Sequence, residues 1–214
     1  MTTWTELYYT RHLIARTYYG VVGVQAITVP AKAAIVRISL VGAGGAGAAD
    51  GVTWGAGAAF ARKKTTCTPG ESFSLQVGDP AHTVGAGSSA GDSTCTRVTG
   101  SVLLAKAERG KSTGPGLAAN SVGDVTRDGS AAPYTGPPYP NGAGYGGSAA
   151  GDDADPYPLG FGGRGAMAGG IWNAVRGGGG GLNINLPAPS GQTFTYRPGP
   201  GLICLEFFDQ DPGY

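Results

Sequence analysis

The chain has 214 residues, and its 15 basic and 14 acidic side chains leave a formal net charge of +1. This balance gives no electrostatic reason to expect nucleic acid or an anionic membrane as a partner. Glycine accounts for 41 residues, about a fifth of the chain against a usual share of roughly 7%, and it follows no G-X-Y period, which excludes a collagen triple helix.

Residues 1–23 differ from the rest because they contain many aromatic side chains but no glycine before Gly20. We interpret them as an attachment or oligomerisation segment that precedes a glycine-rich β domain at 24–214. The alternative is that they add an edge strand to that domain, since their spacing fits neither a helical period nor a strand alternation cleanly. The candidate assembly residues are Trp4, Tyr8, Tyr9, Tyr18 and Tyr19.

Short stretches of alternating apolar residues, separated by turn signals, predict an all-β fold. A tight connection at Pro30 joins the first two stretches, which we expect to form a hairpin or meander. Phe73, Leu75 and Val77 alternate on one face of another stretch. Ten Tyr, six Phe and three Trp supply anchors for a thin core. The predicted strands occupy 24–29, 34–41, 60–68, 71–77, 94–98, 101–106, 182–186, 192–196 and 202–208.

A G-x-G-x-x-G spacing at Gly42, Gly44 and Gly47 directly follows a predicted strand, as in dinucleotide-binding proteins. That motif requires a helix that begins at the glycines and points its free N–H groups at phosphate. The next residues include further glycines at 51, 55 and 57, each of which costs a helix roughly 1 kcal/mol relative to alanine. The spacing therefore does not indicate a nucleotide site.

Residues 108–181 contain few strand signals and are dominated by Gly, Ala, Pro and Tyr. Extended glycine segments of polyproline II type lack side chains, so neighbouring segments can approach closely and hydrogen-bond to one another. We expect such segments to form a stiff base from which loops project. The candidate binding residues on these loops are aromatic: Tyr134, Tyr139, Tyr145, Tyr157, Phe161 and Trp172. The alternative for these side chains is local packing across the glycine segments.

Metal and disulfide sites receive little support from the sequence. Cys67, Cys95 and Cys204 are far apart and odd in number, so we expect buried small hydrophobic residues and not a zinc site or a disulfide framework. The acidic run at Asp152, Asp153 and Asp155 misses the EF-hand spacing, which favours a solvated turn over a calcium site. No cofactor is expected.

Catalytic patterns are also weak. His12 and His82 are the two histidines, and Ser72, Ser74 and Asp79 lie near His82 in the sequence without a nucleophile elbow. A pair of carboxylates for glycoside cleavage leaves no mark in a sequence, so a polysaccharide depolymerase stays open as a minor alternative. We expect a protein that binds and does not catalyse.

Five motifs occur in the order found in the glycine-rich domain of tailed-bacteriophage tail fibre and adhesin proteins, and the chain resembles that family over residues 24–208. The motifs are VPA at 29–31, LVGAGG at 40–45, TPGE at 68–71, QVG at 76–78 and PGLICLE at 200–206. The middle of the chain departs from the family pattern, because proline and tyrosine at 134–140 and acidic residues at 152–156 interrupt the glycine.

The resemblance implies a virion protein at the distal tail that binds a host cell-surface glycan or protein and contacts other tail or capsid proteins. Fibre proteins commonly form trimers, so a homo-oligomer is expected. The alternative is a capsid decoration or head-fibre protein that binds other virion subunits. The expected fold is an all-β, glycine-rich β-sandwich or jelly-roll-like domain with extended polyglycine segments and long loops.

The expected location is the virion, with assembly in the host cytoplasm. The first residues lack the basic and then apolar pattern of a signal peptide. No stretch approaches the roughly 20 apolar residues of a membrane span, so no membrane insertion is expected.

Overall fold

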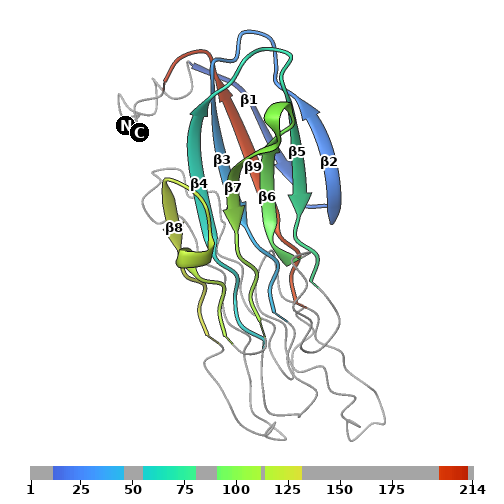
Figure 1. The fold of residues 1–214 in the computed structure, drawn as a ribbon, viewed down its shortest axis with the longest axis vertical. Helices are drawn as coiled ribbons and strands as arrows, with labels where there is room; N and C mark the ends of the chain where they lie inside the picture. The colour runs from blue at the N-terminus through green and yellow to red at the C-terminus, as the bar shows by residue number, and fades with distance from the viewer. Residues whose placement is uncertain (1–11, 46–54, 81–90, 112–113, 132–197, 212–214) are drawn as a thin grey trace, which may run out of the picture.

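A computed structural model of the chain describes residues 12–45, 55–80, 91–111, 114–131 and 198–211. These residues form two antiparallel sheets and no helix beyond short 3-10 turns, so the predicted all-β class is confirmed (Figure 1). The predicted strands at 182–186 and 192–196 lie outside the described residues.

The two sheets differ in size and share the core between them. The five-stranded sheet has the order β1-β9-β3-β4-β8, and the four-stranded sheet has the order β2-β5-β6-β7. The five-stranded sheet consists of β1 (Leu13–Tyr19), β9 (Leu202–Phe208), β3 (Ile35–Val41), β4 (Phe60–Thr66) and β8 (Val125–Arg127). The four-stranded sheet consists of β2 (Gly23–Thr28), β5 (Ser72–Val77), β6 (Ser93–Arg97) and β7 (Val102–Ala107).

The main core lies between the sheets and follows the strand alternation. Phe73, Leu75 and Val77 of β5 are fully buried, as the sequence predicts, while the serines between them face outward. They pack in one cluster with alternate residues of β3 and β9. Burying each such side chain contributes about 1.5–3 kcal/mol relative to leaving it exposed.

The five-stranded sheet is buried on its other face as well. Val41, Phe60 and Cys204 form a second apolar cluster there. Beside it, the carboxylate of Glu206, which has no exposed surface, accepts hydrogen bonds from Arg37 Nε at 2.6 Å and Arg16 Nε at 2.7 Å. A charge this deeply buried is retained only when it is paired, and the two guanidinium groups meet that requirement.

The expected hairpin between β2 and β3 is wrong, because these neighbouring strands belong to different sheets. The turn at Pro30–Ala33 crosses the end of the sandwich, with Lys32 in the left-handed region at φ 71°. Before the turn, Val29 N donates to Glu71 O beside the four-stranded sheet, and after it Ala34 N donates to Phe208 O in the five-stranded sheet. Val29 is itself buried in the core, so the connection closes that end of the sandwich.

The aromatic leader supplies a strand to the body over its described part. β1 lies at the edge of the five-stranded sheet and pairs with β9, which corresponds to the second of the two interpretations of this segment. Tyr19 packs partly against the core, whereas Tyr18 points outward and is 45% exposed. Trp4, Tyr8 and Tyr9 lie outside the described residues, and a role of the leader in attachment stays a prediction.

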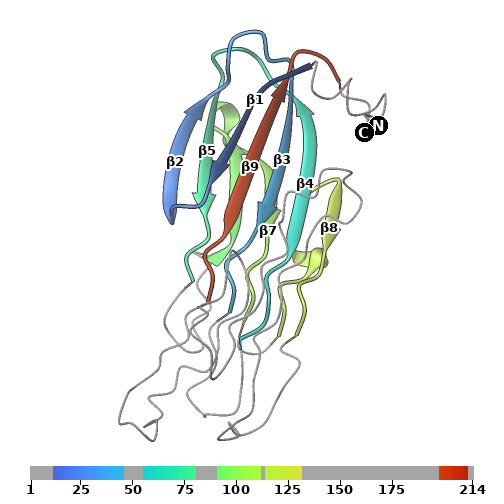
Figure 2. The same ribbon diagram turned by 180° about the vertical axis from the view of Figure 1, so that it is seen from behind.

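The molecule has two unlike ends. At one end, Asp209 N donates to His12 O at 3.2 Å, so the first and last described residues lie together (Figure 2). At the other end, β3, β5 and β7 run out of the sheets into extended glycine segments, and β4, β6 and β9 are entered from similar segments. The connections that reach beyond the described residues therefore leave from this second end.

Candidate functional site: the glycine bundle and its outer end

The extended segments at the second end form what we call the glycine bundle. It consists of residues 42–45, 55–59, 78–80, 91–92, 108–111, 114–117, 128–131 and 198–201, none of which belongs to a sheet strand. Each segment runs beside others that are distant in the sequence (Figure 1). The bundle thus extends the sandwich without extending its sheets.

Hydrogen bonds from three consecutive residues define the geometry of the bundle. Ala43 N donates to Gly91 O at 2.8 Å, Gly44 N to Gly199 O at 2.9 Å, and Gly45 N to Ala56 O at 2.9 Å. A β-strand directs its donors to two sides in one plane, whereas a polyproline II helix has three residues per turn and directs successive donors about 120° apart. Three different acceptor segments in succession are therefore what a packed bundle of polyproline II type requires.

The same pattern continues outward from the central segment. Further backbone bonds join Gly110 N to Ala43 O, Ala56 N to Lys111 O, Gly57 N to Ser130 O, Gly116 N to Gly57 O, Gly129 N to Gly116 O and Gly201 N to Gly78 O, all between 2.9 and 3.1 Å. The expectation that glycine segments hydrogen-bond to one another is confirmed for the described part of the chain. Gly42 and Gly44 of the dinucleotide-like spacing belong to this network.

Close backbone approach explains why the segments are glycine. A Cβ atom on Gly42 would lie 2.5 Å from Glu108 O, and one on Gly45 would lie 2.5 Å from Lys111 N. A Cβ on Gly110 would overlap Ala56 O outright. Since real Cβ atoms essentially never come within 3.0 Å of such atoms, any side chain at these positions forces the segments apart.

Two polar side chains connect the bundle to the sandwich. Ser93 Oγ donates to Val41 O at 2.7 Å and accepts from Gly78 N at 3.1 Å, so one buried hydroxyl joins the ends of β3, β5 and β6. Asp92 accepts from Arg109 N at 3.0 Å and pairs with Lys106 Nζ at 3.2 Å. These groups satisfy backbone polar atoms where regular sheet pairing stops.

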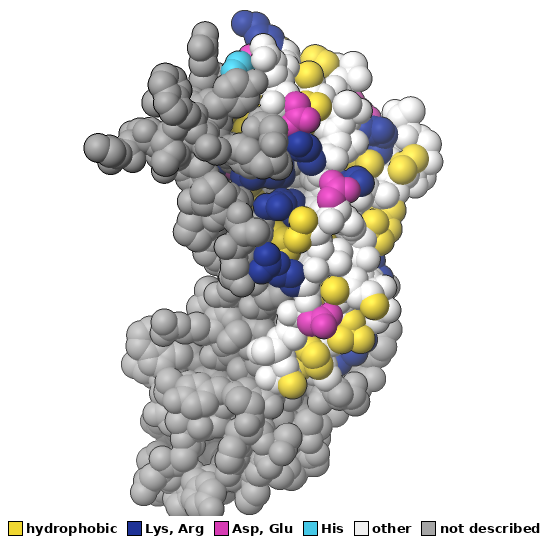
Figure 3. Space-filling view, turned by 90° about the vertical axis from the view of Figure 1, so that its left-hand side faces the viewer, with side chains coloured by type: hydrophobic (Ala, Val, Ile, Leu, Met, Phe, Trp, Pro, Cys, Tyr) yellow, Lys and Arg dark blue, Asp and Glu magenta, His cyan; other side chains and the backbone are white. Residues whose placement is uncertain are grey.

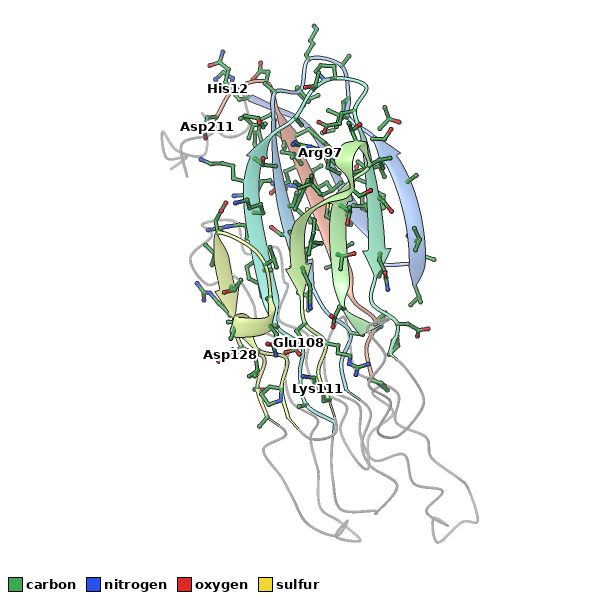
Figure 4. All side chains as sticks on the ribbon, viewed as in Figure 1. His12, Arg97, Glu108, Lys111, Asp128 and Asp211 are labelled. Atoms are coloured by element: carbon green, nitrogen blue, oxygen red, sulfur yellow. The ribbon has the colours of Figure 1, made fainter. Side chains whose placement is uncertain are left out.

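A third polar side chain, Glu108, accepts three hydrogen bonds at the start of the bundle (Figure 4). Its Oε1 accepts from Lys111 Nζ at 2.6 Å and from Asn120 Nδ2 at 3.0 Å, while Oε2 accepts from Leu117 N at 2.7 Å. Burial favours a raised pKa for Glu108, but the three donors outweigh it and leave the pKa below its ordinary value. The carboxylate thus holds the segment at 114–121 against the end of β7.

That segment closes one side of the sandwich. Val122 forms a bridge with Lys106 of β7 through bonds of 2.8 and 3.0 Å, and Asp124 N donates to Arg62 O of β4 at 2.7 Å. The Asp124 carboxylate also pairs with Lys63 at 2.5 Å. Figure 3 shows the charged side chains that gather on this side of the molecule, over β4 and β8.

The outer end of the bundle is the candidate functional site. Residues 45 and 55, 80 and 91, and 131 and 198 flank the three longest internal stretches outside the described residues, and all six lie in the bundle. The predicted binding residues Tyr134, Tyr139, Tyr145, Tyr157, Phe161 and Trp172 all lie in one of these stretches, outside the described residues. Their roles stay predictions.

The described residues bring no catalytic arrangement together from the predicted candidates. His12 pairs with Asp209 at 2.9 Å at the end opposite the bundle, and Ser72 and Ser74 lie on the outer face of β5. His82 lies outside the described residues, as do Asp152, Asp153 and Asp155. Among the described residues, no group of three or more His, Cys, Asp or Glu side chains could hold a metal ion.

The cysteines are buried free thiols, as expected. Burial raises the pKa of Cys95 and of Cys204 to about 12 and that of Cys67 to about 11. Because the thiolate is the reactive form, these side chains act as small apolar residues of the core.

The anchors of the bundle were missed from the sequence. Glu108, Asp92 and Ser93 stand next to predicted strand ends in a chain with only 14% charged residues. The first residues after a strand must find new hydrogen-bond partners for their backbone groups. An acidic residue between a predicted strand and a glycine can supply such a partner, and this pattern is the sequence signal for Glu108.

Comparison with models of protein families and with curated proteins finds no match for this chain. In the described part of the chain, no helix has the length and apolar character needed to cross a membrane.

Proposed function

We propose that this chain is a non-enzymatic bacteriophage virion protein, a tail fibre or tail-tip component that binds a host cell-surface glycan or protein. The observation that supports it most is the bonding of Ala43, Gly44 and Gly45 to three separate segments. A bundle held in three directions is stiff, and it is built mostly from glycine, alanine and proline. Such a base suits a protein whose contacts are made by loops at its tip.

The two unlike ends support the same proposal. Residues 12 and 209–211 lie at the end away from the bundle. We propose that this end faces the rest of a virion. The proposed assembly residues are Trp4, Tyr8, Tyr9, Tyr18 and Tyr19, of which Tyr18 and Tyr19 lie on β1. The bundle end faces outward in this arrangement.

The composition of residues 132–197 suits a binding tip. Tyrosine and tryptophan bury large area with few rotatable bonds, stack on the apolar faces of sugars and dominate the energetics of protein interfaces. Six such aromatic side chains are proposed for contact, and the 132–197 stretch that carries them is anchored by Gly129 and Gly199 in the bundle.

The proposal is tested by replacing Tyr139 and Tyr145 with alanine in the virion. Adsorption to host cells is expected to fall about tenfold or more, because each lost aromatic anchor of an interface removes on the order of 1–2 kcal/mol. Val98→Ala is the control, since Val98 is an exposed apolar side chain directly after β6, at the end of the sandwich away from the bundle. Unchanged adsorption of the double variant, or an equal loss in the control, would reject binding through these tyrosines.

A further inference from the structure

The two sheets have four edge strands, β1, β8, β2 and β7. Three of them carry features that discourage pairing with another chain. β1 has a register shift between Leu13 and Ala15, and its Arg16 reaches Glu206. β8 is three residues long. β7 has a register shift opposite Cys95 and Thr96, and Val122 occupies its edge at Lys106. Bulges, short strands, charges and covering segments are the usual protections of sheet edges.

The fourth edge, β2, has none of these protections. Its register with β5 runs without a shift from Gly23 to Thr28. Residues 17–31 contain no charged side chain and no proline before Pro30. In the part of the chain that the structure describes, no strand pairs with the outer side of β2, which is the outermost strand in Figure 1.

Apolar side chains are also exposed along this edge. Val21 is 75% exposed, Val24 is 71% exposed and Val22 is 42% exposed. The neighbouring outward positions on β5 are Ser72, Ser74 and Gln76, which are uncharged. Figure 3 shows charged side chains over β4 and β8, on the side of the molecule away from β2. The β2 edge is therefore regular, apolar and free of charge.

We propose that the β2 edge pairs with the β2 edge of a second copy of this chain. An isologous contact brings each residue against the same surface of its partner, so a charge near the axis would meet its own copy. The absence of charge over 17–31 removes that penalty and suits an identical partner. The open N–H and C=O groups of the two strands then form a new antiparallel ladder.

The geometry of the pair follows from strand alternation. Residues opposite one another in an antiparallel pair point to the same face, so a two-fold axis through Ala26 places Ala26 against its own copy and Val24 against Thr28 of the partner. Ala26 is exposed and small, so it accommodates this close contact. The two four-stranded sheets become one continuous sheet.

This contact closes with two copies and leaves no free β2 edge for a third. It therefore points to a dimer, in contrast to the trimer that the family resemblance implies. The inference does not depend on what the bundle end binds, because association is measured without any host or virion component.

The test is sedimentation velocity of the full-length chain over a wide range of concentrations. The wild-type chain is expected to show a concentration-dependent dimer. Ala26→Lys and Ala26→Glu, each alone, are expected to raise the dimer Kd by about tenfold or more, because like charges then lie directly opposite one another. Ala119→Lys is the matched control, since Ala119 is an exposed alanine in the segment that closes the other side of the sandwich, and it should associate like the wild type.

Mixing the two charged variants separates a lost contact from a damaged fold. An equimolar mixture of Ala26→Lys and Ala26→Glu chains places opposite charges across the axis and should restore the dimer. A wild-type chain that stays monomeric, a trimer, an association that neither variant weakens, or a mixture that does not recover would each overturn the proposal.

Discussion

At the scale of single residues, Glu108 shows how a few polar side chains hold a structure that has no ordinary secondary elements. Three donors, Lys111 Nζ, Leu117 N and Asn120 Nδ2, converge on its carboxylate at 2.6–3.0 Å. Because the residue is 7% exposed, these hydrogen bonds replace water that the buried carboxylate has lost. A single ionised group thus positions a whole connecting segment.

The lowered pKa of Glu108 makes this part of the molecule sensitive to acid. A carboxylate with a lower pKa in the folded state contributes stability that is fully present above its unfolded pKa, about 4.3, and is lost as the pH falls through the folded value. Glu108→Gln should therefore lower stability at pH 7 by about 1–2 kcal/mol and reduce the loss of stability below about pH 4.

Urea unfolding between pH 3 and pH 7 measures both effects. Asp79→Asn is a suitable control, because it also removes one carboxylate from the bundle but Asp79 is exposed and is not part of the Glu108 hydrogen-bond network. A Glu108→Gln variant with the wild-type stability at pH 7 would contradict the anchoring role of this side chain.

At the scale of elements, the glycine bundle depends on distances that only a missing side chain allows. The segment at 108–111 passes so close to 55–59 that a Cβ on Gly110 would overlap a backbone oxygen, whereas a Cβ on Gly114 would meet nothing within 4 Å. These two glycines belong to neighbouring segments and differ in their surroundings. Close packing therefore requires glycine at position 110 but not at position 114.

Gly110→Ala is expected to destabilise the protein by about 2–3 kcal/mol or more, because the methyl group presses against backbone atoms that cannot move alone. Gly114→Ala should be neutral or stabilising by up to about 1 kcal/mol through the loss of freedom in the unfolded chain. The midpoints of urea unfolding compare the two. Equal effects of both substitutions would argue against close packing at Gly110.

The strands show how much of the fold could be predicted from the sequence. The strands at 24–29, 34–41, 71–77 and 202–208 were placed within a residue or two, because alternation and flanking turn residues are local signals. The sequence left β1 open between an edge strand and an attachment segment, because both of its faces carry large side chains, with Tyr18 outward and Tyr19 inward, which hides the alternation. The partners of each strand were not predictable, since sheet order depends on residues distant in the sequence.

The candidate site could also be predicted only in part from the sequence. Hydrogen bonding between glycine segments was predicted from composition alone, because segments without side chains have few other ways to satisfy their backbone groups. Which segments meet was not predictable: Gly44 bonds to Gly199, a pairing that no local pattern encodes. The hydrogen-bond partners of the anchoring residues Ser93 and Glu108 are likewise set by the fold.

At the scale of the whole molecule, the sandwich is joined to the glycine bundle, with the first and last described residues at one end and the bundle at the other. β9 lies between β1 and β3, so the last described strand completes the five-stranded sheet. We propose that the first end serves assembly and that the second contacts the host, so the bundle end should point away from the particle.

Gold-labelled antibodies against this protein, imaged on intact phage particles, test that claim most directly. Antibodies raised against the 132–197 peptide should bind intact particles at the distal tip of the tail, and antibodies against the 1–11 peptide should label only after the tail is disrupted. Label over the head, or tip labelling by the 1–11 antibodies with none by the 132–197 antibodies, would contradict the proposed function and orientation.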